Sequence, residues 1–149
     1  MNGFGAQAYR RINVDTGLDS ADPHALILML FDGALEAIKN AQGHIASGRV
    51  SEKGHALGKA VRIVEEGLKA SLDREAGGAL TERLAHLYDY ATLRLLQANL
   101  RNDHAALAEV AGLLTDLRAA WGAIGKRPAQ ASPEAAPVGG APRRLVVSA

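Results

Sequence analysis

The chain contains no cysteine, and only 4% of its residues are aromatic. The absence of cysteine excludes disulfide bonds and thiolate chemistry, and it fits a reducing compartment. No stretch approaches the roughly 18 apolar residues that a membrane span requires, and the N-terminus lacks the basic start and apolar stretch of a secretory signal. We therefore expect a cytoplasmic protein without membrane insertion.

Charge of one sign is also lacking. The formal net charge of the 149 residues is +1, and lysine and arginine are scattered along the chain. No basic patch of the kind that binds nucleic acid is visible. The five histidines form no HExxH or Glu-x-x-His pair, and no glycine-rich phosphate loop follows a strand. We expect no metal, no cofactor, no nucleic acid and no enzymatic activity.

Of the residues of the chain, 48% are hydrophobic. They recur at three- and four-residue spacing, which indicates amphipathic helices. Asp22 before Pro23 predicts the start of a first helix, which runs to about Ser47 and stops at Gly48. Ser51 is the predicted cap of a second helix. The inward apolar stripe of this second helix ends at Leu72.

A third helix is predicted to start near Ala79 and to break at Asn102 and Asp103, either of which could cap a fourth helix that closes at Gly125. Gly54, Gly58 and Gly67 fall inside the second helix, where their expected role is close helix packing. The predicted inward stripe of the third helix is Leu80, Leu84, Leu87, Ala91, Leu95 and Ala98.

The links between the four helices are short, which favours antiparallel neighbours. The sequence therefore predicts an all-α, up-and-down four-helix bundle over residues 21–125. Residues 1–20 are too sparse in apolar residues for a core of their own and are predicted to be a capping segment. Residues 126–149 hold four of the five prolines, which predicts a disordered tail.

The third helix has more apolar residues than one stripe requires. Leu93, Leu96 and Leu100 fall near the side opposite Ala91, and Ile63 belongs to a separate row on the second helix. Soluble monomers rarely leave such a surface exposed unless something binds it, and an amphipathic helix is the natural ligand. Packing of the N-terminal segment over part of this surface is the competing interpretation.

One enzymatic alternative concerns His55. Histidine phosphotransfer domains are four-helix bundles with a reactive, exposed histidine, and Gly58 and Lys59 follow His55 closely. Their order is reversed relative to that pattern, however, and His55 falls near the start of its helix. A solvent-facing structural histidine is the favoured interpretation.

Short motifs spread over about residues 8 to 125, nearly the whole predicted bundle, match the pattern of one known family. They are Ala8-Tyr9, Ala21 to His24, Leu30-Phe31-Asp32-Gly33-Ala34, Lys53-Gly54, Gly67-Leu68, Leu72-Asp73, Gly77-Gly78, Leu87-Tyr88-Asp89-Tyr90, the run from Arg94 to Asp103, and Trp121. On these residues the chain resembles the FliS family of flagellin-specific export chaperones.

This resemblance implies a bundle with an N-terminal cap that binds the disordered C-terminal segment of flagellin. Such binding keeps flagellin from polymerising before export and helps deliver it to the cytoplasmic domain of the flagellar type III export gate. A protein that binds an amphipathic segment needs an outer apolar surface. The resemblance and the apolar periodicity of the third helix therefore indicate the same function.

We assign the partner-binding residues on this basis. The predicted wall is Ile63, Tyr90, Leu93, Leu96, Leu100 and Leu113, and the predicted displaceable cover is Tyr9 and Ile12. Tyr88, Asn99 and Trp121 are expected to maintain the fold, with Asn99 satisfying backbone groups at the turn between the last two helices.

Overall fold

The computed structural model describes residues 22–73, 75 and 77–125. The predicted capping segment 1–20, with Tyr9 and Ile12, and the predicted tail 126–149 lie outside these residues. The chain separates into two units, Met1–Arg118 and Ala119–Ala149. The arrangement below is that of the first unit.

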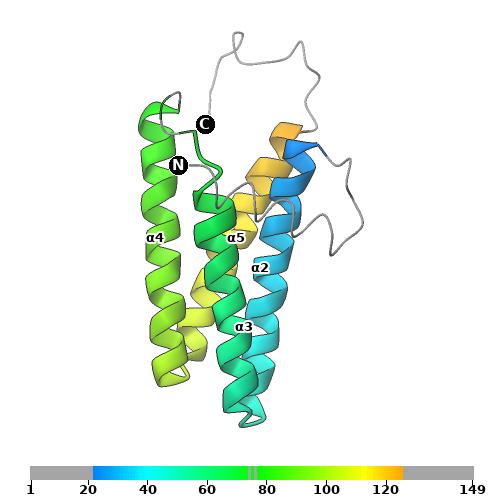
Figure 1. Ribbon diagram of the computed structural model, residues 1–149, viewed down its shortest axis with the longest axis vertical. Helices are drawn as coiled ribbons and strands as arrows, with labels where there is room; N and C mark the ends of the chain where they lie inside the picture. The colour runs from blue at the N-terminus through cyan, green and yellow to red at the C-terminus, as the bar shows by residue number, and fades with distance from the viewer. Residues whose placement is uncertain (1–21, 74, 76, 126–149) are drawn as a thin grey trace. The chain divides into compact units, whose positions relative to one another are not determined.

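Helices account for the regular structure of the described residues, and no strand occurs among them. They are α2 (Pro23–Ala46), α3 (Val50–Arg62), its π-helical continuation η1 (Ile63–Lys69), α4 (Gly78–Arg101) and α5 (His104–Gly125). The α3–η1 helix packs against both α2 and α4 (Figure 1). Hydrogen bonds join α5 to α4 through Glu109 and to α2 through Arg118. The predicted all-α four-helix bundle is confirmed.

Short polar motifs set the helix ends where the sequence predicts them. The Asp22 carboxylate accepts a hydrogen bond of 2.7 Å from the backbone N–H of Ala25, which satisfies one of the orphan donors of α2. Gly48, just past the end of α2, has a φ of +72°. Asn102 ends α4 in the left-handed region at φ +51°, and Asp103 accepts from the N–H of Ala106 at 3.1 Å.

Two local predictions are wrong. Ser51 does not cap the second helix, because α3 begins at Val50 with Arg49 at the N-cap and no side-chain cap there. Leu80 does not point inward, since 60% of it is exposed. The first turns of α4 instead bury the smaller side chains of Thr81 and Ala85.

The α2–η1 contact is close because a glycine lies opposite a leucine. A Cβ added at Gly67 would be 2.9 Å from Leu30 Cδ2, and Leu30 is fully buried. Close packing is therefore the role of Gly67. It is not the role of the other two glycines: a Cβ at Gly54 would meet nothing within 4 Å, and one at Gly58 would meet only the guanidinium of Arg62.

Candidate partner-binding surface

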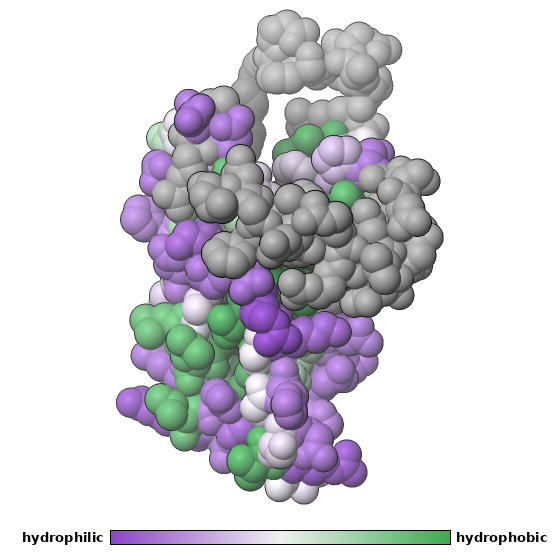
Figure 2. Space-filling model, viewed as in Figure 1, coloured by the Kyte–Doolittle hydropathy of each residue, from purple (hydrophilic) through white to green (hydrophobic). Residues whose placement is uncertain are grey.

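Three leucines of α4 lie on the surface. Leu93 is 52% exposed, Leu96 49% and Leu100 84%, and we call these three side chains the leucine row. Figure 2 shows hydrophobic side chains gathered over the half of α4 that ends at Arg101, among hydrophilic neighbours. The exposure predicted for these residues is confirmed.

The opposite face of α4 is buried and made mostly of small side chains. Its members are Thr81, Ala85, Tyr88, Ala91, Leu95 and Ala98. Tyr88 is the largest of them, and burial raises the pKa of its phenol well above the ordinary value because the charged form is disfavoured in the core. Its burial agrees with the expected structural role. Four leucines of α4 are thus exposed (Leu80, Leu93, Leu96 and Leu100), Leu84 and Leu87 are half-buried, and Leu95 is buried.

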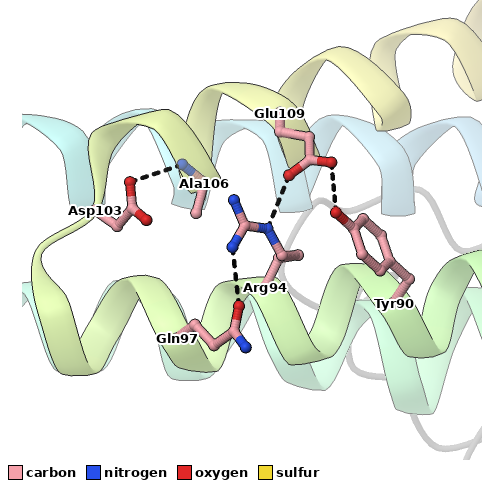
Figure 3. Close-up of polar contacts among 6 residues, drawn as sticks. All are labelled: Tyr90, Arg94, Gln97, Asp103, Ala106 and Glu109. Carbon is pink, nitrogen blue, oxygen red and sulfur yellow. Dashed lines mark hydrogen bonds and ion pairs between the residues drawn. The ribbon is translucent and has the colours of Figure 1, made fainter.

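Along one edge of the leucine row, α4 is tied to α5 by a single carboxylate. Glu109 accepts a hydrogen bond from the Tyr90 hydroxyl at 2.5 Å and another from Arg94 Nε at 2.8 Å (Figure 3). Arg94 Nη1 also donates to Gln97 Oε1 at 2.9 Å. The bonds from Tyr90 and then Arg94 lower the pKa of Glu109, whereas the Glu109 hydrogen bond raises the pKa of Tyr90.

Along the other edge, α4 is tied to η1. The Thr92 hydroxyl donates to Glu65 Oε2 at 2.8 Å, and Lys69 Nζ lies 2.5 Å from Asp89 Oδ1. Lys69 also lies 3.7 Å from Glu65, so the pairs form one small network. The leucine row is therefore bordered on both sides by polar contacts with a neighbouring helix.

A buried lysine holds the end of α4 that carries Leu100. Lys53 is 7% exposed, and its Nζ donates to the backbone oxygen of Asn99 at 2.8 Å and to Asn102 Oδ1 at 2.6 Å. The last carbonyls of a helix have no partner within the helix, so the ammonium satisfies one of them at the negative end of the helix dipole. At this turn the backbone oxygen of Asn99 and the side chain of Asn102 both accept from Lys53. The expected role of Asn99 in satisfying backbone groups stays a prediction.

Ile63 lies apart from the leucine row. It is 8% exposed, and its Cδ1 would be 3.3 Å from a Cβ added at Gly33 of α2. The missing side chain of Gly33 leaves the space that Ile63 fills, on the α2 side of the α3–η1 helix. The expectation that Ile63 shares an outer surface with the leucines is therefore wrong.

The other predicted wall residues lie on α4 and α5. Tyr90 is 41% exposed and contributes to the α4–α5 edge, not to the row itself. Leu113 is half-buried on α5, one turn after Glu109. The structure therefore brings together Tyr90 and the leucine row on α4. Partner contact by any of these residues stays a prediction.

Sequence reasoning missed two residues that organise this surface. Lys53 precedes Leu57 by four residues and so lies on the inward stripe of its helix, which was a usable signal. Glu109 offered no such signal. Its importance depends on where α5 places it beside Tyr90 and Arg94, and a single sequence does not reveal that register.

Other kinds of site find no support in the described part of the chain. Within it, no group of three or more histidine, aspartate and glutamate side chains could hold a metal ion. None of its helices is long and apolar enough to cross a membrane. His55 is exposed near the start of α3, where the sequence placed it.

The fold and this surface define a class of protein: an all-α four-helix bundle with a row of exposed leucines on one helix. The model of the family described as flagellar protein FliS matches residues 5–128. The chain therefore belongs to the FliS family of flagellar secretion chaperones, which is a family of chaperones and not of enzymes.

Relatives at high identity agree. The flagellar secretion chaperone FliS of Salmonella typhimurium strain LT2 is 50% identical over 117 residues, which cover 78% of this chain and 87% of the relative. The protein of the same name from Escherichia coli strain K12 is 44% identical over 117 residues, covering 78% and 86%. That from Bacillus subtilis strain 168 is 40% identical over 114 residues, covering 76% and 80%.

Proposed function

We propose that this chain binds the C-terminal segment of flagellin in the cytoplasm, prevents its premature polymerisation, and aids its delivery to the cytoplasmic domain of the flagellar type III export gate. The observation that carries the proposal is the leucine row. Three large apolar side chains stand exposed on one helix of a chain whose relatives are named as flagellar secretion chaperones. An amphipathic helix with apolar residues three and four apart is the ligand that such a row fits.

The apolar surface of the leucine row is too small to hold a client by itself. Burying a leucine fully contributes about 1.5 to 3 kcal/mol, and Leu93 and Leu96 are already half-covered, so the whole row supplies about 4 kcal/mol. A micromolar complex requires about 8 kcal/mol after the costs of association. The client must therefore contact more of the chaperone than this row. A disordered segment that wraps around the bundle meets that requirement.

The test is a double substitution in the row. Leu96→Glu with Leu100→Glu should leave the helical circular dichroism intact, because both side chains are exposed, and abolish co-purification with the flagellin C-terminal segment. The control is Leu80→Glu, which also places a glutamate at an exposed apolar position of α4, 60% exposed, more than three turns before Leu93. Retained binding by the row variant would discard this surface.

Delivery to the export gate is tested separately. We expect the cytoplasmic domain of the gate to be retained on the immobilised chaperone more strongly when the flagellin segment is bound than when it is absent. Equal retention by the free and loaded chaperone would contradict a role in delivering the client.

A further inference from the structure

The leucine row creates a conflict within α4. The buried face of this helix is built mainly from Thr81 and three alanines, whereas three of its leucines stand in water. Apolar burial is favourable in proportion to the area removed from water. A rotation of α4 about its own axis that moved these leucines against a neighbouring helix would bury them, but it would expose Leu95 and Tyr88, which are in the core now. Because these two effects oppose each other, polar contacts at the edges of the helix influence which rotation the protein holds.

These polar contacts lie on both edges of the helix. Thr92 holds α4 to Glu65 of η1 on one side, and Tyr90 and Arg94 hold it to Glu109 of α5 on the other. Ties on two edges resist rotation in either direction. Glu109 of α5 contacts Tyr90 and Arg94 of α4 (Figure 3), and Leu93, the first residue of the leucine row, lies between these two residues in the chain.

We propose that Glu109 is a positioning residue for client binding: by accepting from both Tyr90 and Arg94, it fixes the rotation of α4 that keeps the leucine row facing outward. The inference rests on the proposed function for its biological meaning, because the row is useful outward only if a client binds it. The rotation itself is a property of the free protein and is measurable without a client.

A carboxylate suits this role because each of its oxygens accepts one of the two donors, at 2.5 and 2.8 Å. The isosteric amide of Glu109→Gln keeps a single acceptor oxygen and carries no charge, so the charge-assisted hydrogen bond from Arg94 is weakened even when that oxygen faces the arginine and the NH₂ group faces the tyrosine oxygen. The substitution therefore weakens the contact between α4 and α5 and leaves the size of the side chain at position 109 unchanged. Glu36→Gln on α2, which also removes one exposed carboxylate, is the matched control.

The absence of cysteine from the chain makes the rotation measurable by thiol labelling. A reporter is introduced by Leu93→Cys in the row, and a reference by Thr115→Cys at an exposed position of α5. We expect Glu109→Gln to slow labelling at position 93 relative to position 115, and Glu36→Gln to leave the ratio unchanged. If Glu109 only stabilises the fold, Glu109→Gln should lower the melting temperature and leave the labelling ratio unchanged. That result would overturn the proposal.

Client affinity gives the second readout, with the flagellin C-terminal segment as the probe. If the outward state falls to about a third of the molecules, the apparent Kd rises about threefold. Arg94→Met removes the partner of Glu109 on α4. In this background, Glu109→Gln should therefore raise the apparent Kd by less than it does in the parent chain. Strong binding by the parent chain with an unchanged labelling ratio in Glu109→Gln would overturn this inference and leave the proposed function intact. Absence of binding by the parent chain would overturn the proposed function, and the labelling ratio would still decide the rotation of α4.

Discussion

Replacing Lys53 by methionine removes the buried ammonium that joins α3 to the end of α4. Its two hydrogen bonds, to the backbone oxygen of Asn99 and to the side chain of Asn102, are lost together. A hydrogen bond to a charged group contributes about 1.5 to 3 kcal/mol, and an acceptor left unpaired in a buried place costs a similar amount. Methionine keeps most of the packing of the lysine stem, so we expect a net loss of about 2 kcal/mol in the free energy of unfolding.

That loss corresponds to a measurable melting shift. The entropy of unfolding is about 2.1 cal/mol/K per residue, so for a bundle of roughly 100 residues the melting temperature should fall by about 10 °C. Thermal unfolding followed by circular dichroism at a helical wavelength measures it. The control is Lys59→Met, the same replacement at an exposed position of the same helix, which should change stability by less than about 0.5 kcal/mol. Equal melting temperatures for the two variants would refute the reasoning.

Three further predictions concern other contacts of the bundle. Gly67→Val should lower the free energy of unfolding by about 1 to 3 kcal/mol in urea titrations, because its side chain would enter the space of the buried Leu30; an unchanged midpoint would mean that the contact is loose. Asp103→Ala should cost about 1 kcal/mol in the same assay by removing the N-cap of α5, and a loss below the error of the assay would remove that role. The depressed pKa of Glu109 means that its stabilising contribution is complete above the ordinary glutamate pKa of about 4.3 and is lost as the pH falls through the lower folded value. A carboxyl NMR titration should show this pKa rising toward the ordinary value in Arg94→Met, and no change there would contradict the tie.

The helix ends were predictable because local chemistry sets them. Asp22 with Pro23, Gly48, and the pair Asn102 and Asp103 act within a few residues of the chain, and each behaves as the sequence indicates. Ser51 failed because a serine near a helix start is a frequent cap but not an obligatory one. Here the helix begins at Val50 with Arg49 at the N-cap, two residues earlier than a cap at Ser51 predicts.

The buried and exposed faces of a helix were predictable from its own apolar period only where no special feature of a neighbouring helix changes the packing. Leu93, Leu96 and Leu100 are exposed as the periodicity indicates. Ile63 is buried against the prediction because Gly33, on another helix, leaves room for it. Leu80 is exposed, and Thr81 and Ala85 are the buried residues in the first turns of α4. The apolar period of one helix does not predict such contacts with residues of another helix.

The most direct test of the central claim is calorimetric titration of the flagellin C-terminal segment into the chain at several temperatures. We predict binding with a distinctly negative heat-capacity change, because apolar surface on both partners leaves water. In the Leu96→Glu, Leu100→Glu variant we expect lower affinity and a smaller heat-capacity change. The same affinity and the same heat-capacity change in that variant would mean that the client is held somewhere other than on the leucine row.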